Sequence, residues 1–279
     1  MVHGLRKHLL RSAANRPMKN GMNSEADVSG IVIPSGNTRT KHATIGGMRW
    51  RDWVVTAVVG LGTIATAALG ESAYHAYTRE DGICETFQVL FFVLALIEAV
   101  RAFRGLQARG RKTTAALYVI AILGLCFLIG EEISWGQRIF GWHTPEDLAH
   151  INRQGETTLH NIGEAQDMVG WALLAIGIWG SVLPWLLRPR ASLARMRETL
   201  SPYVPSTRFA PYFLPMLVWR IYRNFFPLPS KFTYAVVQLN EPMELLMAIG
   251  FWLFFLDRRR AFATAAEETP VPSAKTRPV

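Results

Sequence analysis

The segment GEEISWGQR, residues 130–138, follows an uninterrupted apolar run and gathers two carboxylates, an indole, an amide and a guanidinium group. Carboxylates can donate or accept protons during catalysis, and an arginine can bind a carboxylate or a phosphate through paired hydrogen bonds. Ionisable groups at the end of a membrane-type apolar run are costly unless they are paired, hydrated or bound to a metal ion. The candidate catalytic residues of this segment are Glu131 and Glu132, and its candidate substrate-binding residues are Trp135, Gln137 and Arg138.

Three further carboxylates lie inside or beside apolar runs. Glu85 lies about one turn into the second run, and Gln88 follows on the same face. Glu241 and Glu244 are three residues apart and also share a helical face. Pro242 between them cannot donate a backbone hydrogen bond, so we expect a kinked helix, which is a common way to line a polar cavity in a bilayer. These runs add Glu85, Glu241 and Glu244 to the candidate catalytic residues.

A Glu-xxx-His spacing occurs at Glu71–His75 and again at Glu156–His160. Side chains four residues apart in a helix meet above the same turn, and a carboxylate with an imidazole can bind zinc, iron or manganese. The same spacing is more often a surface contact, so a metal site requires several such groups to converge. The candidate ligands for a divalent metal ion are Glu131, Glu156, His160 and His75.

The composition indicates that a membrane-embedded scaffold positions these residues. Of the 279 residues, 50% are hydrophobic and 18% are charged, and the apolar residues form long blocks. A helix needs about 20 apolar residues to cross a hydrocarbon core of about 30 Å, and several blocks approach that length. We expect an all-α, polytopic integral membrane helical bundle with about six transmembrane helices. The expected spans lie near residues 53–74, 81–100, 113–135, 167–187, 208–226 and 235–256, and the fifth is the least apolar.

The basic residues predict the orientation of this bundle. The formal net charge is +9, and the lysines and arginines cluster in alternate connections and at both termini. This distribution follows the positive-inside rule, so it predicts that both termini are cytoplasmic and argues against a nucleic-acid partner. The expected boundaries are a disordered basic tail at 1–48, a transmembrane domain at 49–257 with an extracytoplasmic loop at 136–166, and a flexible tail at 258–279.

The same orientation places most carboxylates near the span ends on the extracytoplasmic face. Arg220 lies near the outer end of the fifth span, where an unpaired guanidinium is costly, so we expect it to meet this acidic cluster and to bind substrate. Part of the asymmetry has a simpler explanation, because carboxylates at helix N-termini interact favourably with the helix dipole. The residues that this explanation covers are Glu80, Asp81, Glu164 and Asp167.

The stretches EDGICE, GEEISWGQRIFGW and GETTLHNI resemble those of an uncharacterised family of bacterial polytopic membrane proteins with EDG, EEISWGQR and ETxLHN motifs. The resemblance covers most of residues 51–257 and implies a multi-pass protein of the bacterial inner membrane. It implies a site but no particular reaction. Thr158 stands where the family motif has asparagine. The positions that match the motifs are Glu85, Glu131, Glu132, Trp135, Gln137, Arg138, Glu156, His160 and Asn161, and Asn161 joins the candidate substrate-binding residues.

Three classes of function fit these observations. The first is a metal-dependent hydrolase or transferase acting on a lipid or lipid-linked substrate from the bilayer. The second is a proton- or cation-coupled transporter that uses the same carboxylates, and the third is a structural or assembly subunit with buried ion pairs. The chain contains no GxSxG, HExxH, Walker A, GxGxxG or CxxCH motif, which argues against serine hydrolysis, zincin chemistry, ATP hydrolysis and c-type haem.

Overall fold

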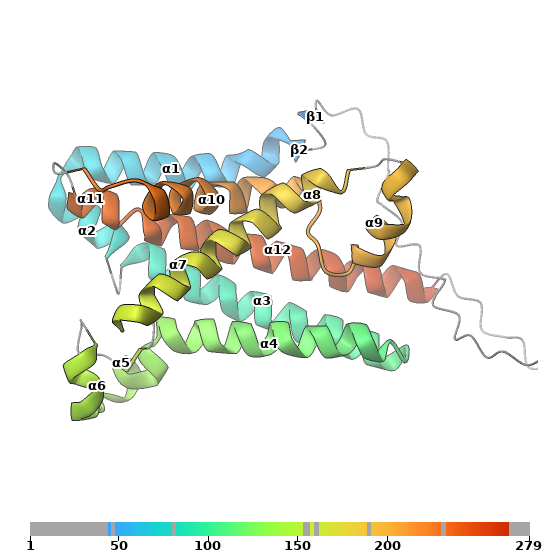
Figure 1. Ribbon diagram of the computed structural model, residues 1–279, viewed down its shortest axis with the longest axis horizontal. Coiled ribbons are helices and arrows are strands. Elements are labelled where there is room, and N and C mark those ends of the chain that lie inside the picture. The colour runs from blue at the N-terminus through green and yellow to red at the C-terminus, as the bar shows by residue number, and fades with distance from the viewer. Residues whose placement is uncertain are drawn as a thin grey trace, which may run out of the picture. The chain divides into compact units, whose positions relative to one another are not determined.

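The computed structural model describes residues 44–45, 48–79, 82–152, 157–158, 162–188, 191–229 and 233–267, which are almost entirely helical (Figure 1). The main helices are α1 (Trp50–Leu69), α2 (Glu71–Thr78), α3 (Ile83–Ala108), α4 (Lys112–Glu132), α7 (Gly163–Gly177), α10 (Ala210–Phe225) and α12 (Asn240–Glu267). Shorter elements are the antiparallel strands β1 (Thr44–Ile45) and β2 (Met48–Arg49), the helices α5 (Gln137–Phe140), α6 (Glu146–Ile151), α8 (Leu183–Leu186), α9 (Ala194–Leu200) and α11 (Thr233–Val237), the 3-10 turns η1 (Ser134–Gly136), η3 (Ala191–Leu193) and η4 (Thr207–Phe209), and the π-helical turn η2 (Ile178–Val182).

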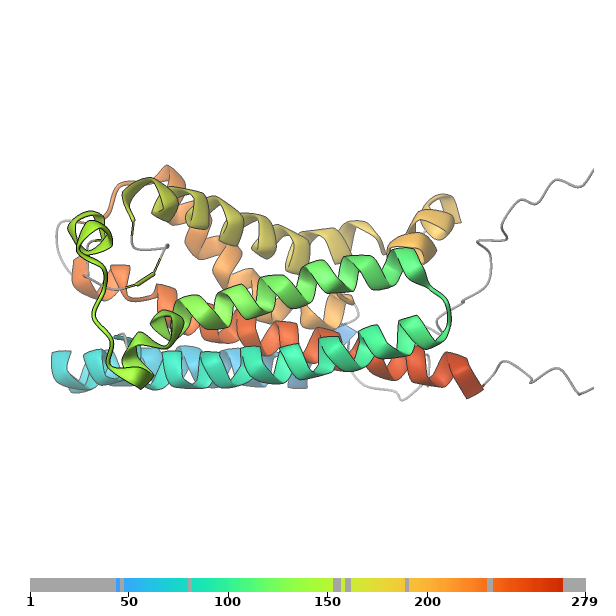
Figure 2. The same cartoon turned by 90° about the horizontal axis from the view of Figure 1, so that it is seen from below.

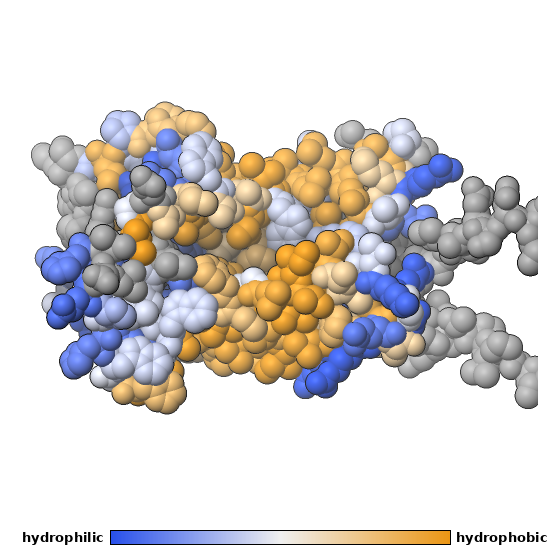
Figure 3. Space-filling model, turned by 60° about the horizontal axis from the view of Figure 1, so that its bottom comes forward, coloured by the Kyte–Doolittle hydropathy of each residue, from blue (hydrophilic) through white to orange (hydrophobic). Residues whose placement is uncertain are grey.

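Five helical segments in the described part of the chain are long and apolar enough to cross a membrane. Their outward faces are apolar, and in α1 the side chains of Val58, Leu61 and Ile64 are 62%, 65% and 68% exposed. Figure 3 shows apolar residues in a band across the middle of the bundle and hydrophilic residues at both ends. Monomeric soluble proteins rarely expose apolar patches of this extent, whereas a bilayer would cover such a band. The structure is therefore consistent with a multi-pass membrane protein.

The expected fifth span corresponds to α10, which is not among the five segments. At 16 residues this helix is about 24 Å long, shorter than a typical hydrocarbon core. Its first turn lies beside α1, where the Thr56 hydroxyl donates to the Pro211 carbonyl at 2.9 Å. Near its other end the Trp219 indole donates to Asn240, at the start of α12, at 3.3 Å. α10 therefore runs antiparallel to α12 through the bundle.

The core forms where α12 packs along α3 and α10, with α4 against α3 and α7 against α10 (Figures 1 and 2). Phe213 of α10 is fully buried between Gly180 of η2 and Gly250 of α12. A Cβ at Gly250 would lie 2.7 Å from the Phe213 ring, and a Cβ at Gly177 would lie 2.9 Å from the Leu217 backbone. Glycine at these positions lets the helix backbones approach closely, as in other membrane helix interfaces.

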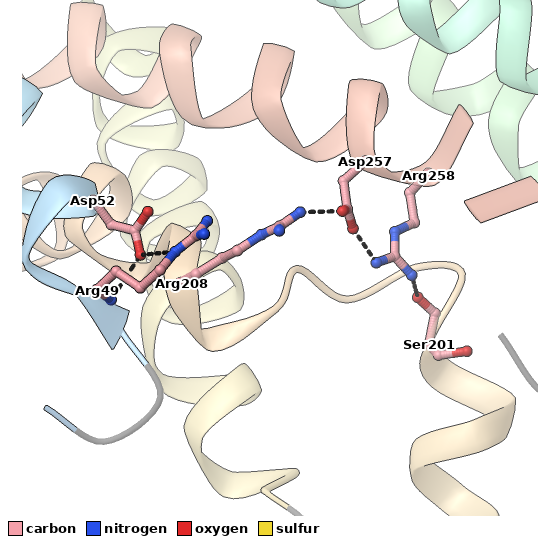
Figure 4. Close-up of polar contacts among 6 residues, drawn as sticks. All are labelled: Arg49, Asp52, Ser201, Arg208, Asp257 and Arg258. Atoms are coloured by element: carbon pink, nitrogen blue, oxygen red, sulfur yellow. Dashed lines mark hydrogen bonds and ion pairs between the residues drawn. The ribbon is translucent and has the colours of Figure 1, made fainter. Parts of the chain in front are cut away.

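The end of the bundle with the α12 C-terminus is held by arginine ion pairs (Figure 4). Arg208, just before α10, and Arg258 both bind the Asp257 carboxylate, and Arg258 also donates to the Ser201 carbonyl at 2.6 Å. Glu98 of α3 binds Arg101 at 2.8 Å and also binds Arg259 at 2.5 Å. These contacts join α12 to α3, to η4 and to the residue after α9 at this end of the bundle.

Two expectations about helix limits are wrong. The first span does not continue through residue 74, because Gly70 has φ 115° and separates α1 from α2. The expected interruption near Pro242 is seen in part: the helical stretch Ala235–Ala263 is broken by a turn at residues 238–239, and Pro242 lies in the first turn of α12, which follows. The tail expected from residue 258 begins later, because α12 continues to Glu267 with Arg258 buried. Most of the expected tail at 1–48, and residues 268–279, lie outside the described residues.

Candidate functional site

A cavity of about 850 Å³ lies at the opposite end of the bundle from the arginine ion pairs. Its walls come from α3, α4, α7, α10 and α12, at the end where α4 terminates and α7 and α12 begin. Among the described residues, its lining contains three guanidinium groups, which belong to Arg79, Arg220 and Arg223. The carboxylates of the described lining are Glu85, Glu131, Glu132, Asp167, Glu241 and Glu244. The cavity thus brings together all five predicted catalytic carboxylates and Arg220, whose roles stay predictions.

The GEEISWGQR segment folds back on the end of α4. After Glu132 the chain passes through left-handed backbone at Ser134, Trp135 and Gly136, with φ of 48°, 53° and 88°. Left-handed conformations at two consecutive non-glycine residues are strained and persist where surrounding contacts hold them. The contact here is the indole of Trp135, which packs on Gly130 and donates to Glu131 Oε1 at 2.6 Å. Trp135 therefore orients a cavity carboxylate rather than lining the cavity.

Gln137 serves the loop beyond this turn. Its amide nitrogen donates to the Thr144 hydroxyl at 2.9 Å, and its amide oxygen accepts from the Thr157 backbone at 2.8 Å. Buried Thr158 accepts from the Asn152 amide through its carbonyl at 2.8 Å. Gln137 and Thr158 thus hold the loop together, and Gln137 is not among the cavity residues. The predicted roles of Glu156, His160, Asn161 and the Arg138 side chain lie outside the described part of the structure.

Glu244 is held by three helices. Gln88 of α3 donates to Glu244 Oε2 at 3.1 Å, and the Asn240 amide donates to Oε1. Arg220 of α10 lies 3.9 Å from the same oxygen and donates to Asn240 Oδ1 at 2.7 Å. The Arg220 and Glu244 side chains are 14% and 13% exposed, so bulk water screens this pair weakly. The expected meeting of Arg220 with the acidic cluster is observed in this contact.

Sequence reasoning missed Asn224, Asn240 and the inclusion of Asp167 and Arg223 in the site. Asn240 is four residues before Glu244, and Asn224 is four residues after Arg220, so each shares a helical face with a residue that was identified. This four-residue spacing was the indication in the sequence that both asparagines belong to the site. Asp167 was attributed to the helix dipole alone, but it also lines the cavity.

The predicted metal ligands are not assembled by the described residues. Within the described ranges, no group of three His, Cys, Asp or Glu side chains has the arrangement to hold a metal ion. His75 contacts Glu71 at 3.2 Å and Gln238 at 3.0 Å, and it is not among the cavity residues. Glu156 and His160 lie outside the described ranges, so the metal site stays a prediction.

Charge is distributed unevenly around the cavity. Glu85, Glu131 and Glu132 lie on α3 and α4, which pack together, whereas Arg220 and Arg223 lie on α10, which packs on α7 and α12. Asp167 of α7 and Arg79, just before α3, add a charge of the opposite sign on each side, and Glu244 of α12 contacts Arg220. A cavity of this size and lining can bind a polar group that has charges of both signs.

The chain was compared with known proteins to test whether this arrangement has been described. No family model, curated protein or solved structure matches it. The function of the site must therefore be argued from its geometry.

Proposed function

We propose that the protein is a multi-pass membrane hydrolase or transferase that acts on a lipid or lipid-linked substrate in this cavity. In this proposal the bundle crosses the bacterial inner membrane six times, because α10 crosses in addition to the five apolar segments. Both termini then lie in the cytoplasm. The cavity then opens on the extracytoplasmic side. The observation that carries the proposal is a cavity of about 850 Å³ at one end of an apolar bundle, whose described lining contains six carboxylates and three arginines.

The carboxylates supply the groups that ester or phosphoester cleavage requires. One carboxylate removes a proton from water, or from an acceptor hydroxyl in a transferase, as its oxygen attacks the substrate carbon or phosphorus. The bond to the leaving oxygen breaks, and a protonated carboxyl group gives that oxygen a proton. Glu131 is the first candidate for the base because Trp135 holds one of its oxygens at 2.6 Å. Arg220 binds the anionic part of the substrate.

The cavity is also placed to receive a substrate from the bilayer. α4 and α7 both contribute residues to the lining of the cavity. Phe127 of α4 and Trp171 of α7 are among them, and they are 41% and 54% exposed. In this proposal these two apolar side chains border an opening of the cavity toward the membrane. A lipid can therefore place its headgroup among the charged residues while its chains stay in the membrane.

The experiment is turnover of a bacterial polar lipid extract by the purified, reconstituted protein, followed by mass spectrometry of the lipids. We expect one lipid class to be consumed with time and enzyme concentration, and Glu131→Gln to reduce the rate by about 100-fold or more. Glu198→Gln is the matched control, because Glu198 is exposed on α9 and distant from the cavity residues. No lipid change with the wild type, or equal rates for wild type and Glu131→Gln, would contradict the proposal.

A structural role is the second candidate, because the Arg220–Glu244–Gln88 contacts join α10, α12 and α3. Such networks occur in buried scaffolds without catalysis. If the protein is only a scaffold, neither the wild type nor Glu131→Gln changes any lipid. The helical bundle still folds in both.

Transport has less support. Toward the far end of the bundle α12 continues with Phe251, Phe254 and Phe255, which pack on aromatic rings of neighbouring helices. That packing fills the path between the cavity and the basic end, whereas a transporter needs a polar route to both faces.

A further inference from the structure

A surface of aromatic rings begins on α4 and continues onto α5. Phe127 of α4 packs edge-to-face on Trp135 of η1, with 5.9 Å between the ring centroids. Phe140 of α5 stacks on Trp142, with 5.2 Å between the ring centroids. A Cβ at Gly136 would lie 3.1 Å from the Phe140 ring and 3.3 Å from the Trp142 ring, so the backbone directly after Trp135 lies against the second pair. The four rings therefore form one aromatic surface at the end of α4.

The part of the aromatic surface that follows α4 is exposed. Phe140 and Trp142 are 72% and 46% exposed, and Ile139 beside them is 65% exposed. Neither Phe140 nor Trp142 is among the cavity residues, so these two rings do not close over the charged groups. Large apolar side chains that cluster on a surface mark a contact with another protein or with a membrane.

The loop that carries the stacked rings is amphipathic. Gly141, between the rings, ends α5 in a left-handed conformation with φ 69°, which glycine adopts without strain. The Gln137 amide donates to the Thr144 hydroxyl at 2.9 Å and accepts from the Thr157 backbone at 2.8 Å. These bonds satisfy polar groups within the protein and leave both rings outside. A segment at a membrane surface needs this arrangement, because an unsatisfied polar group in an apolar environment is costly.

The surface of α4 indicates what covers the rings. Ile120 and Leu123 are 64% and 63% exposed and belong to one of the five segments that are long and apolar enough to cross a membrane. Phe127 lies on the same face of this helix, and α5 lies beside the end of α4 (Figure 1). The aromatic surface is therefore continuous with the surface of α4 that a bilayer would cover. Tryptophan is enriched at the boundary between hydrocarbon and headgroups, where one part of its ring system is apolar and its N–H can contact water.

We propose that Ile139, Phe140 and Trp142 form an interfacial anchor that inserts into the membrane leaflet at the cavity end of the bundle. The partner of this surface is the lipid itself, at the boundary between the headgroups and the acyl chains. The anchor attaches the beginning of the loop at 136–166 to the membrane rather than to the mouth of the cavity. The inference requires that the bundle crosses a membrane, but it does not depend on any reaction in the cavity.

The test is site-directed spin labelling of the full chain in vesicles of phosphatidylethanolamine and phosphatidylglycerol. Labels are placed one at a time at Phe140→Cys and Trp142→Cys in a Cys126→Ser background, because Cys126 is exposed whereas Cys84 is buried. Power saturation is measured with oxygen, which concentrates in hydrocarbon, and with a nickel chelate, which stays in water. We expect high oxygen and low nickel accessibility at both positions, corresponding to a depth of about 5–10 Å.

Two labelled positions calibrate this experiment. Leu123→Cys reports the apolar surface of α4, and Glu146→Cys reports an exposed charged position at the start of α6 in the same loop. The oxygen-to-nickel ratio at residues 140 and 142 should lie well above the ratio at residue 146 and approach that at residue 123. The Cys126→Ser protein without an added cysteine measures any labelling of Cys84.

Each other outcome overturns the anchor. Nickel accessibility at residues 140 and 142 equal to that at residue 146 would place the rings in water. Low accessibility to both reagents would place protein over the rings, either from this chain folded over the cavity or from a second copy.

A second measurement avoids the cysteine variants. Lipids brominated near the headgroup should quench the tryptophan fluorescence of the wild type more than that of Trp142→Phe. Equal quenching in the two proteins would place Trp142 outside the bilayer and refute the anchor. Failure of the proposed function is a separate result: a protein that turns over no lipid can still have the anchor, and an enzyme can have α5 in water.

Discussion

The contact between Gly130 and Trp135 predicts that Gly130→Ala destabilises the wild type but stabilises the Trp135→Phe variant. A Cβ at Gly130 would lie 2.9 Å from two carbons of the Trp135 six-membered ring. Gly130→Ala therefore overpacks this contact, at a cost of about 1–3 kcal/mol, and gains about 0.5–1 kcal/mol from the helix preference of alanine over glycine. In the wild-type background we expect a net loss of about 0–2.5 kcal/mol in the free energy of unfolding.

In a Trp135→Phe background the same substitution should stabilise the protein. Phenylalanine lacks the outer ring that approaches Gly130, so the Cβ has room and the helix preference of about 0.5–1 kcal/mol remains. Trp135→Phe by itself removes the indole donor to buried Glu131 and should cost about 1.5–3 kcal/mol, the range for hydrogen bonds to charged groups. The double variant should consequently be more stable than Trp135→Phe alone.

The assay is equilibrium unfolding in mixed micelles as the fraction of denaturing detergent is raised, for all four members of the double-mutant cycle. The interaction free energy between the two positions should be about 1–3 kcal/mol, equal to the overpacking cost that the smaller ring removes. If Gly130→Ala has the same effect in both backgrounds, the indole does not pack on Gly130.

Three further predictions concern the ion pairs, the metal and the topology. Asp257→Asn leaves Arg208 and Arg258 without their shared anion and should lower the free energy of unfolding by about 1–3 kcal/mol, with a smaller loss at high salt, as measured in the same mixed micelles. If a divalent ion occupies the predicted ligands, elemental analysis of the purified protein should find near-stoichiometric zinc, iron or manganese that is lost in Glu131→Ala and in His160→Ala; a metal-free, folded wild type would contradict this. A reporter fused to the C-terminus should be cytoplasmic, since its appearance outside would mean that α10 does not cross and that α12 is inverted.

The membrane-type helices were predictable because a hydrophobic span is a local property. About 20 consecutive apolar residues form a helix in a bilayer whatever their neighbours are, so the apolar runs located the five segments that the structure shows. α10 was the least certain because its prolines and arginines lower its hydropathy, and only its contacts with Thr56 and Asn240 show how it runs. Its place in the bundle depends on partners far away in the sequence.

Helix ends in polar regions were not predictable in the same way. The cluster Arg258–Arg260 was interpreted as the boundary of the last span, yet the helix continues through it. Asp257, Glu98 and the Ser201 carbonyl, which come from three different segments, bind these arginines and hold the helix in place. Contacts between segments, rather than local propensity, decide where this helix ends.

By itself the sequence determined the class of the protein, the approximate spans and the acidic character of one end, because apolar runs and charge asymmetry depend on local composition. It also identified Glu85, Glu131, Glu132, Glu241 and Glu244 as unusual carboxylates. The tertiary structure decided which of the selected residues share one cavity and which, such as Trp135 and Gln137, hold other residues in place. Bringing the carboxylates of α3 and α4 into one cavity with the arginines of α10 requires the packing of these helices around α12, which is a long-range property that no local pattern contains.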